Sequence, residues 1–133
     1  MLGAMTVLEA ADRLYARWNA DGLAVLSDSV DPSVELICDP LRPDESALRG
    51  MSGWQAWVAR WEEHYDDVHV TVDALMPIDA EHVLALVSIT ATPKRGSGLL
   101  SWAAAHLWTL RDGRIAGWEP HLDLDAARRT LEP

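Results

Sequence analysis

The chain contains no phenylalanine and a single cysteine, Cys38, although it contains seven tryptophans and two tyrosines. One cysteine excludes an internal disulfide and any metal cage built from several thiolates. Because phenylalanine is missing, the aromatic content is almost entirely indole. Indole is wide, flat and amphipathic, so it suits both protein cores and pockets for apolar ligands.

Long apolar runs and a surplus of basic residues are also missing. No apolar stretch approaches the ~20 residues that a membrane span requires. The net charge of −10 argues against nucleic acid and anionic membranes as partners, because both are bound through clustered Lys and Arg. The acidic balance is typical of a well-solvated surface. The opening stretch MLGAMTVLEAADRLY carries acidic residues and no basic leader, so we expect no signal peptide and a cytoplasmic protein.

The 133 residues predict one domain, 1–133, with one hydrophobic core. Thr6 and Glu9 have the spacing of a capping box, which predicts a helix that begins there and ends near residues 19–22. A short helix is expected over 23–29. A third helix is expected over 52–65, where the spacing of Trp54, Trp57 and Trp61 gives one face three indoles.

Alternating and β-branched residues predict strands over 34–39, 68–76, 82–92, 99–110 and 115–122. The two prolines in 40–46 indicate a loop, and Asp112-Gly113 is typical of a hairpin turn. Asp123 is expected to cap a short helix over 123–131. Helices followed by antiparallel strands, with one helix between the strands, predict an α+β fold in which helices pack on one face of a curved sheet.

Four stretches carry a resemblance to a known family: LYARWNADGLAVL, VELICDP, LRGMSGWQAWVARW and AHLWTLRDGRIAGW. They resemble SnoaL-like proteins of the nuclear-transport-factor-2-like superfamily, which includes ketosteroid isomerases, polyketide cyclases and limonene-type epoxide hydrolases. The resemblance implies a cone-shaped curved sheet, antiparallel or mixed, that wraps around about three helices and encloses an apolar pocket open at one end. Enzymes and pure binding modules share this fold.

The resemblance also implies two polar residues in the pocket. Asp39-Pro40 matches the position of the general base in ketosteroid isomerases, at the end of the first strand. His106 falls where those enzymes carry a second, proton-donating acid. Their oxyanion tyrosine corresponds to Leu14, and Tyr15 is turned about 100° from it around the helix. The resemblance therefore predicts that this tyrosine donor is missing here.

Strand alternation assigns the residues around His106 to two faces. Trp102, Ala104, Trp108 and Leu110 share its face, which the resemblance turns into the cone. We therefore expect an indole-lined pocket for a flat, apolar ligand, formed by Tyr15, Trp18, Trp57, Trp61, Trp102, Trp108 and Trp118. The other face carries Ala103, Ala105 and Leu107, which would be exposed on a lone cone, so we expect a homodimer through that outer sheet face.

Asp39 and His106 are the predicted catalytic pair. A carboxylate in an apolar pocket holds its proton more tightly than in water, so Asp39 would serve as general base near neutrality. His106 would donate to a developing oxyanion or return the proton. This pair fits proton abstraction beside a carbonyl, the step common to isomerisation, aldol-type cyclisation and dehydration, whereas hydrolysis would need Asp39 to activate water. No cofactor is expected, and no metal, because Asp39, His106, His121 and Asp123 lack a known metal spacing.

Two hypotheses follow from these residues. The first is a small enzyme without cofactor that acts on a polyketide-like or terpenoid-like carbonyl compound. The second is a binding or assembly module that holds an apolar ligand or partner without changing it. The second stays open for two reasons. Asp-Pro is also common at the start of a turn, where the Asp carboxylate accepts hydrogen bonds from loop N–H groups, and a lone histidine on a strand is often a hydrogen-bonded core residue.

Overall fold

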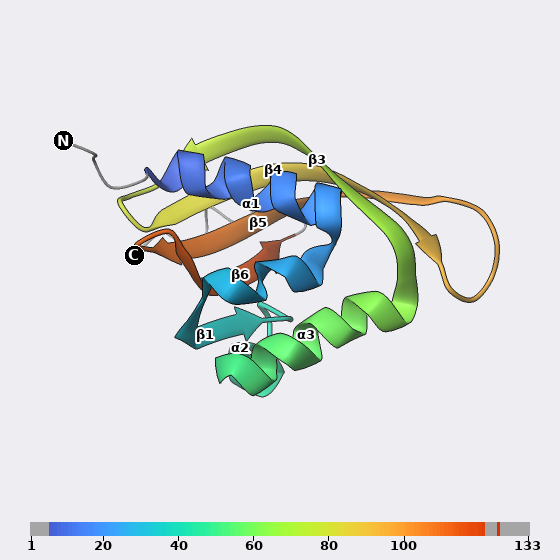
Figure 1. The fold of residues 1–133 in the computed structure, drawn as a ribbon, viewed down its shortest axis with the longest axis horizontal. Helices are drawn as coiled ribbons and strands as arrows, with labels where there is room; N and C mark the ends of the chain where they lie inside the picture. The colour runs from blue at the N-terminus through green and yellow to red at the C-terminus, as the bar shows by residue number, and fades with distance from the viewer. Residues whose placement is uncertain (1–5, 122–124, 126–133) are drawn as a thin grey trace.

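The computed structural model describes residues 6–121 and 125. Its helical elements are α1 (Val7–Asp21), the 3-10 helix η1 (Leu23–Ser29), α2 (Pro43–Ser46) and α3 (Gly50–His64). Its strands are β1 (Val30–Ile37), β2 (Ala47–Arg49), β3 (Tyr65–Pro77), β4 (His82–Pro93), β5 (Leu100–Arg111) and β6 (Arg114–His121). Figure 1 shows α1 lying across the sheet and β3 bending away from it to meet the end of α3.

The six strands form one mixed sheet in the order β2-β1-β6-β5-β4-β3. β1 runs parallel to β6 and every other neighbouring pair is antiparallel. The pairing of β3 with β4 shifts register twice, between Asp66 and His69 and between Val72 and Ala74. Such irregularities bend a strand, and here they accompany the curl of the sheet around its helices. The predicted α+β fold with a curved mixed sheet is confirmed.

Local signals fix both ends of α1. The Thr6 hydroxyl accepts a hydrogen bond from the Glu9 N–H at 3.1 Å, which confirms the first half of the predicted capping box. The helix ends at Gly22, whose φ of 93° suits a residue without a side chain and whose N–H donates to the Trp18 carbonyl. The Asn19 side chain then binds both the N–H and the C=O of Val70, at 2.8 Å and 2.7 Å. This pair of bonds joins α1 to β3.

α3 lies close against β2 because Gly53 has no side chain. A Cβ at this position would lie 2.6 Å from the carbonyl carbon of Leu48, which is closer than real Cβ contacts. Trp54 and Trp57 are buried on this helix. The Trp54 indole N–H donates to the Ser27 hydroxyl at 2.8 Å and so joins α3 to η1.

Two segments differ from the sequence predictions. β1 begins at Val30, four residues before the predicted start at residue 34, and passes through Pro32. Its pairing with β6 shifts register between Val30 and Glu35, so the proline lies where the ladder is irregular. The predicted loop over 40–46 contains the helical turn α2, and β2 follows it by pairing with β1. The helix predicted over 123–131 lies outside the described residues, apart from Asp125.

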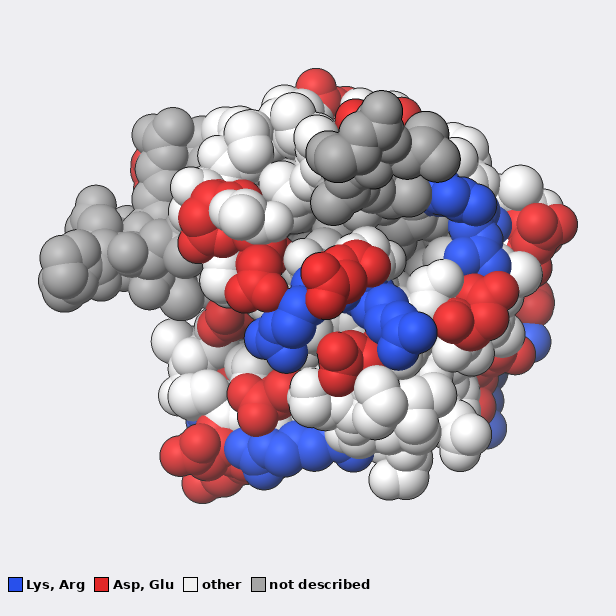
Figure 2. Space-filling model, turned by 60° about the vertical axis from the view of Figure 1, so that its left-hand side comes forward, with Lys and Arg blue, Asp and Glu red and all other residues white. Residues whose placement is uncertain are grey.

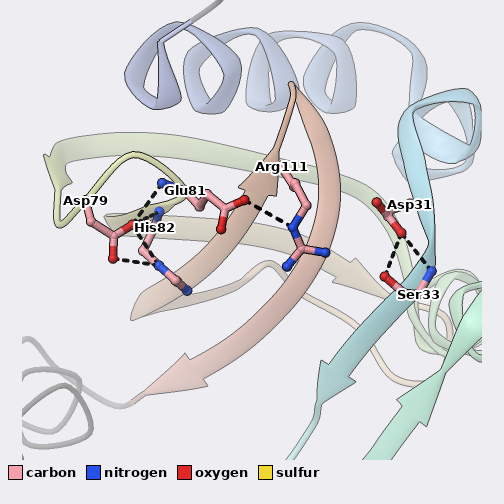
Figure 3. A network of polar contacts seen from close by, with 6 residues as sticks. All are labelled: Asp31, Ser33, Asp79, Glu81, His82 and Arg111. Atoms are coloured by element: carbon pink, nitrogen blue, oxygen red, sulfur yellow. Dashed lines mark hydrogen bonds and ion pairs between the residues drawn. The ribbon is translucent and has the colours of Figure 1, made fainter.

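A polar network ties the β3–β4 turn to the end of β5 (Figure 3). The Asp79 carboxylate accepts from the backbone N–H groups of Glu81 and His82, at 2.8 Å and 2.9 Å, and contacts Nδ1 of His82 at 2.8 Å. The Glu81 carboxylate accepts from Nε of Arg111 at 3.1 Å. The Glu81 carbonyl also accepts from the Leu110 N–H at 2.7 Å. The turn and the strand are therefore held together by both main-chain and side-chain bonds.

The outer face of the sheet corrects one expectation. Ala103 is exposed as predicted, but Ala105 and Leu107 are only 0% and 7% exposed within this single chain, so the exposure predicted for them is wrong. They form a second apolar cluster with Leu84, beside half-buried Met76 and Leu86. Much of this face is therefore already covered without a second copy.

The surface mixes charges of both signs. Figure 2 shows Asp and Glu side chains interspersed with Lys and Arg on one face of the molecule, without a continuous basic patch there. Within residues 6–121, none of the helices is both long enough and apolar enough to cross a bilayer.

Candidate functional site

His106 lies in the middle of β5 on the concave face of the sheet and is 2% exposed. Its Nδ1 atom is 2.9 Å from the Tyr15 hydroxyl oxygen. The same oxygen accepts a hydrogen bond from the Trp108 indole N–H at 2.7 Å. The buried imidazole is therefore joined to α1 through a tyrosine, and that tyrosine is joined back to β5.

The direction of these bonds assigns the tautomer of His106. An indole N–H can only donate, so the Tyr15 oxygen accepts from Trp108. Among the described residues, the hydroxyl proton of Tyr15 has one acceptor within hydrogen-bond distance, Nδ1 of His106. We therefore assign the ring proton of His106 to Nε2, which makes Nε2–H a donor.

Burial keeps both groups uncharged. It lowers the pKa of His106 to about 3, because the imidazolium would lose its hydration. It also raises the pKa of the Tyr15 phenol well above its usual value, against the smaller opposing effect of the Trp108 hydrogen bond. At neutral pH His106 is thus a neutral hydrogen-bond donor, which favours oxyanion stabilisation over proton delivery by an imidazolium.

Tyr15 lies in the interior and bonds to His106, although the resemblance placed Leu14, not Tyr15, at the position of a tyrosine donor. Leu14 and Tyr15 are both buried, at 5% and 2% exposure. The curved sheet and the other helices cover a wide arc of α1, so two neighbouring residues on it face different parts of the core. The i to i+3 spacing of Tyr15 and Trp18, whose rings are 6.1 Å apart, was the available sequence signal.

The residues predicted to line a pocket form one connected aromatic cluster around His106. Trp57 lies near its centre, with its ring 4.7 Å from that of Trp118 and 6.5 Å from that of Trp108. The ring of His106 lies 5.4 Å from that of Trp118. We call this set the aromatic cluster: Tyr15, Trp18, Trp57, Trp61, Trp102, Trp108 and Trp118.

Exposure rises along the concave face away from His106. Ala104 and Trp102, the next two residues of β5 on this face, are half-buried. The Trp61 ring stacks against Trp102 with centres 6.4 Å apart and is also half-buried. The concave face is thus sealed at His106 and reached by solvent at Ala104 and Trp102. We call this half-buried region the open end.

Cys38, one residue past β1, is half-buried. Burial raises the pKa of its thiol, and the Arg60 guanidinium from α3 opposes that rise. The thiol is therefore protonated at neutral pH, which makes it a small apolar side chain rather than a nucleophile.

Asp39 organises the loop after β1. Its Oδ1 atom accepts from the Leu41 N–H at 3.0 Å, its own N–H donates to the Ser46 hydroxyl at 2.9 Å, and its carbonyl accepts from that hydroxyl at 3.0 Å. No hydrogen bond or ion pair joins Asp39 to His106 within the part of the chain that the structure describes. The role of Asp39 as base stays a prediction.

Sequence reasoning missed one feature of the site, the unpaired N–H of Trp118. Trp118 is 6% exposed, and its buried Nε1 atom has no hydrogen-bond partner among the described residues. The only signal available was the abundance of indoles, since every buried indole needs an acceptor. In residues 6–121, no group of three His, Cys, Asp or Glu side chains is arranged as metal ligands.

His121 lies on the other face of the sheet, opposite Ala105 in the pairing of β5 with β6. His121 and Trp118 therefore lie on opposite faces of β6. The Nε2 atom of His121 lies 3.8 Å from the Glu119 carboxylate, which is too far for a hydrogen bond. His121 therefore takes no part in the aromatic cluster.

Comparison with known proteins agrees with this architecture. A family model described as a SnoaL-like domain matches residues 11–118, and no curated protein matches the sequence. A putative SnoaL-like polyketide cyclase from Jannaschia sp. CCS1 is 19% identical, with a TM-score of 0.71 over 100% of this chain and 99% of that chain.

Two further solved structures share the fold. A hypothetical protein with a ketosteroid isomerase-like fold from Catenulispora acidiphila DSM 44928, in complex with trimethylamine, is 17% identical, with a TM-score of 0.72 over 91% of this chain and 90% of that chain. TerC, co-crystallised with polyporic acid, is 18% identical, with a TM-score of 0.70 over 95% of this chain and 98% of that chain. At these identities the likeness shows the fold alone.

Proposed function

Because the chain belongs to the SnoaL-like domain family, we propose that it is a small cofactor-independent enzyme for an apolar carbonyl compound, polyketide-like or terpenoid-like. The proposed reaction is an isomerisation, cyclisation or dehydration that begins with proton abstraction beside the carbonyl. The observation that carries the proposal is His106, a buried and neutral donor oriented by Tyr15 at 2.9 Å. Small molecules bound to two fold relatives, trimethylamine and polyporic acid, support a small-molecule ligand.

In the proposed mechanism Asp39 removes a proton from the carbon next to the carbonyl. The electrons of that C–H bond move to the carbonyl oxygen and form an enolate. The Nε2–H of His106 donates to this oxygen, and the donation is strong because indole rings replace water around it. Protonated Asp39 then returns the proton in one of three ways. It protonates another carbon in an isomerisation, or the oxygen of a second carbonyl that the enolate carbon attacks in a cyclisation. In a dehydration it protonates the β-hydroxyl, which leaves as water while the carbon–carbon double bond forms. Leu41 binds only Oδ1 of Asp39, so Oδ2 is the atom proposed to take the proton.

Proton abstraction can be tested before the natural substrate is known. 2-Tetralone is a flat aromatic ketone whose protons beside the carbonyl exchange with D2O, and NMR follows that exchange. We expect the protein to accelerate the exchange above the buffer rate and Asp39→Asn to lose the acceleration while keeping fold and affinity. Asp44→Asn, an exposed acid in the same loop, is the matched control and should keep full activity. Full activity in Asp39→Asn would refute this mechanism.

A second candidate function is a binding or assembly module that leaves its ligand unchanged. It is favoured by Asp39 itself, whose carboxylate and backbone are engaged with Leu41 and Ser46 in a loop-forming arrangement. This candidate predicts a ligand that co-purifies and is recovered chemically intact by native mass spectrometry and solvent extraction. Conversion of that ligand by the protein alone would exclude it.

We also propose a homodimer through the outer sheet face. Exposed Ala103 and the half-buried Met76 and Leu86 on that face support it, whereas Leu84, Ala105 and Leu107 are already buried within one chain. Light scattering on a size-exclusion column should give the mass of two chains, and Ala103→Glu should reduce it to one. A single-chain mass for the unmodified protein would contradict the dimer.

We propose the cytoplasm as its location. The described chain holds one free thiol, Cys38, which fits a reducing compartment. Fractionation of cells that express the protein with a C-terminal epitope should recover it with cytoplasmic markers.

A further inference from the structure

We propose that the Trp118 indole N–H is a second donor to the oxygen of the bound molecule, next to the Nε2–H of His106. The inference rests on the proposed small-molecule site and specifies its ligand. The ligand must carry an acceptor oxygen, that of a carbonyl or an enolate, at the edge of a flat apolar body. Both N–H groups must reach that oxygen.

The first observation is the unpaired state of Trp118. Its buried Nε1 atom has no hydrogen-bond partner within residues 6–121, whereas two other buried indoles have theirs: Trp54 donates to Ser27 and Trp108 to Tyr15. A buried N–H without an acceptor is rare, because it gives up its bonds to water and gains none. Trp118 thus keeps a donor inside the core that the described protein groups do not use.

The second observation is the position of that donor. Trp118 pairs with Trp108 across β5 and β6, and His106 pairs with the adjacent Pro120 position, so all three rings share the concave face. The rings of His106 and Trp118 lie 5.4 Å apart at 68° to one another. Trp57, on α3, packs against Trp118 with ring centres 4.7 Å apart. The indole of Trp118 and the imidazole of His106 are therefore neighbouring rings in one buried region.

The chemistry of this region favours an acceptor-only oxygen over water. A buried water needs two to four partners, and it must both accept and donate. The strand positions paired with the two donors carry Ala85, Pro120, Leu36 and the Trp108 indole, and the Tyr15 oxygen is already engaged with Trp108 and His106. A carbonyl or enolate oxygen accepts two hydrogen bonds and has no proton to donate, so it suits this environment.

The open end gives the ligand body its place. Trp102 and Ala104 precede His106 on the same face of β5, in steps of about 7 Å per residue pair. Ala104 is small and half-buried, and it lies between two aromatic rings on that face. A flat ring against Trp102 and Ala104 would direct a substituent on its inner edge toward His106 and Trp118.

Two ligands that differ only in one atom group test the inference. 2-Acetylnaphthalene carries a carbonyl oxygen, and 2-isopropenylnaphthalene carries a CH2 group in its place. In the 15N-labelled full-length protein, Trp118→Phe identifies the Trp118 indole N–H signal. We expect the ketone to move this signal downfield and to slow its hydrogen exchange, and we expect the alkene to do neither. The Trp54 signal, bonded to Ser27, should stay unchanged with both.

Affinity gives an independent readout. Trp118→Phe should weaken the binding of the ketone by about tenfold, as expected for the loss of one buried hydrogen bond. It should change the binding of the alkene much less. Because Phe is smaller than Trp, replacement of Trp118 by β-(3-benzothienyl)alanine, which keeps the ring shape and replaces N–H by sulfur, is the second variant. It should show the same selective loss. Equal binding of ketone and alkene, an unmoved Trp118 signal, or no binding of the ketone would overturn the inference.

These outcomes separate the inference from the proposed function. A shifted Trp118 signal without 2-tetralone exchange would support the donor pair and contradict the enzyme. Catalysed exchange with an unmoved Trp118 signal would support the enzyme and overturn the second donor.

Discussion

The hydroxyl oxygen of Tyr15 lies 2.9 Å from Nδ1 of His106, and this bond joins α1 to β5 across 91 positions of sequence. It has two consequences. It satisfies a buried imidazole that would otherwise cost free energy, and it fixes which nitrogen of His106 carries the proton. Stability and site chemistry therefore depend on the same hydroxyl group.

Tyr15→Phe should destabilise the protein and alter the site together. The change leaves the Trp108 N–H and the His106 Nδ1 without their partner, and each buried orphan costs about 1–3 kcal/mol. Urea unfolding should show the loss, and 15N chemical shifts should show His106 leaving the pure Nε2–H tautomer. Tyr65→Phe is the matched control, because Tyr65 is half-buried and its hydroxyl has no hydrogen bond to the described residues. Equal stability of the two variants would contradict this account.

The free energy of unfolding should fall as the pH drops from 7 to 5. Burial lowers the pKa of folded His106 to about 3, whereas the imidazole of the unfolded chain has a pKa near 6.5. Between these values the unfolded state binds more protons, so acid favours unfolding. At pH 5, about 1.5 units below the unfolded pKa, this amounts to roughly 2 kcal/mol.

The control for this pH effect is a pair of variants. His106→Gln removes the titrating group and should flatten the curve between pH 7 and 5, although it lowers stability at both. His69→Gln replaces an exposed histidine and should leave the slope unchanged. The same slope in His106→Gln as in the unmodified chain would show that other groups cause the pH effect.

Local sequence patterns were sufficient for most of the fold. Thr6 at the helix start, the Trp54-Trp57-Trp61 spacing and the alternation through His106 each depend on residues a few positions apart, and each is reproduced in the structure. β2 and the start of β1, which includes Pro32, were missed because each is set by pairing with another strand, β1 for β2 and β6 for the start of β1. Three residues carry too little periodicity to indicate a strand, and a proline is tolerated only where the ladder is irregular.

The site could be predicted only in part for a related reason. Alternation placed His106 and the indoles on one face, but the hydroxyl that binds His106 comes from α1, and the sequence placed Tyr15 in the pocket lining without indicating this bond. The unpaired Trp118 N–H depends on which acceptors its neighbours offer, and that is a tertiary property. Asp-Pro fits both a catalytic base and a loop cap, so the sequence left Asp39 open.

Asp79 should stabilise the fold above about pH 4 and lose that effect below it. The Glu81 N–H, followed by the His82 side chain, lowers the pKa of this carboxylate below the usual 3.8. A carboxylate with a lowered pKa stabilises the folded state while it is charged, and the contribution disappears as falling pH protonates it. The urea midpoint of Asp79→Asn should lie below that of the unmodified chain at pH 7 and approach it near pH 3. Asp12→Asn, at an exposed position of α1, should show no such convergence.

The two neighbouring alanines Ala103 and Ala104 should respond in opposite ways to the same substitution. Ala104 lies half-buried on the concave face next to His106, whereas Ala103 is exposed on the outer face. Ala104→Leu adds three carbons to the open end, where the ligand ring is expected. It should therefore lower the affinity for 2-acetylnaphthalene and the exchange rate of 2-tetralone. We expect each to fall by at least about tenfold, which corresponds to a steric cost of about 1.4 kcal/mol.

Ala103→Leu makes the same chemical change one residue away and should leave both quantities unchanged. Thermal unfolding of the two variants shows whether a loss of binding reflects a loss of fold, and we expect similar stability because neither position is fully buried. If both variants bind like the unmodified chain, the ligand does not reach His106 along Ala104. If only Ala103→Leu loses binding, the functional face of the sheet is the outer one, and the assignment of the site to the aromatic cluster is wrong.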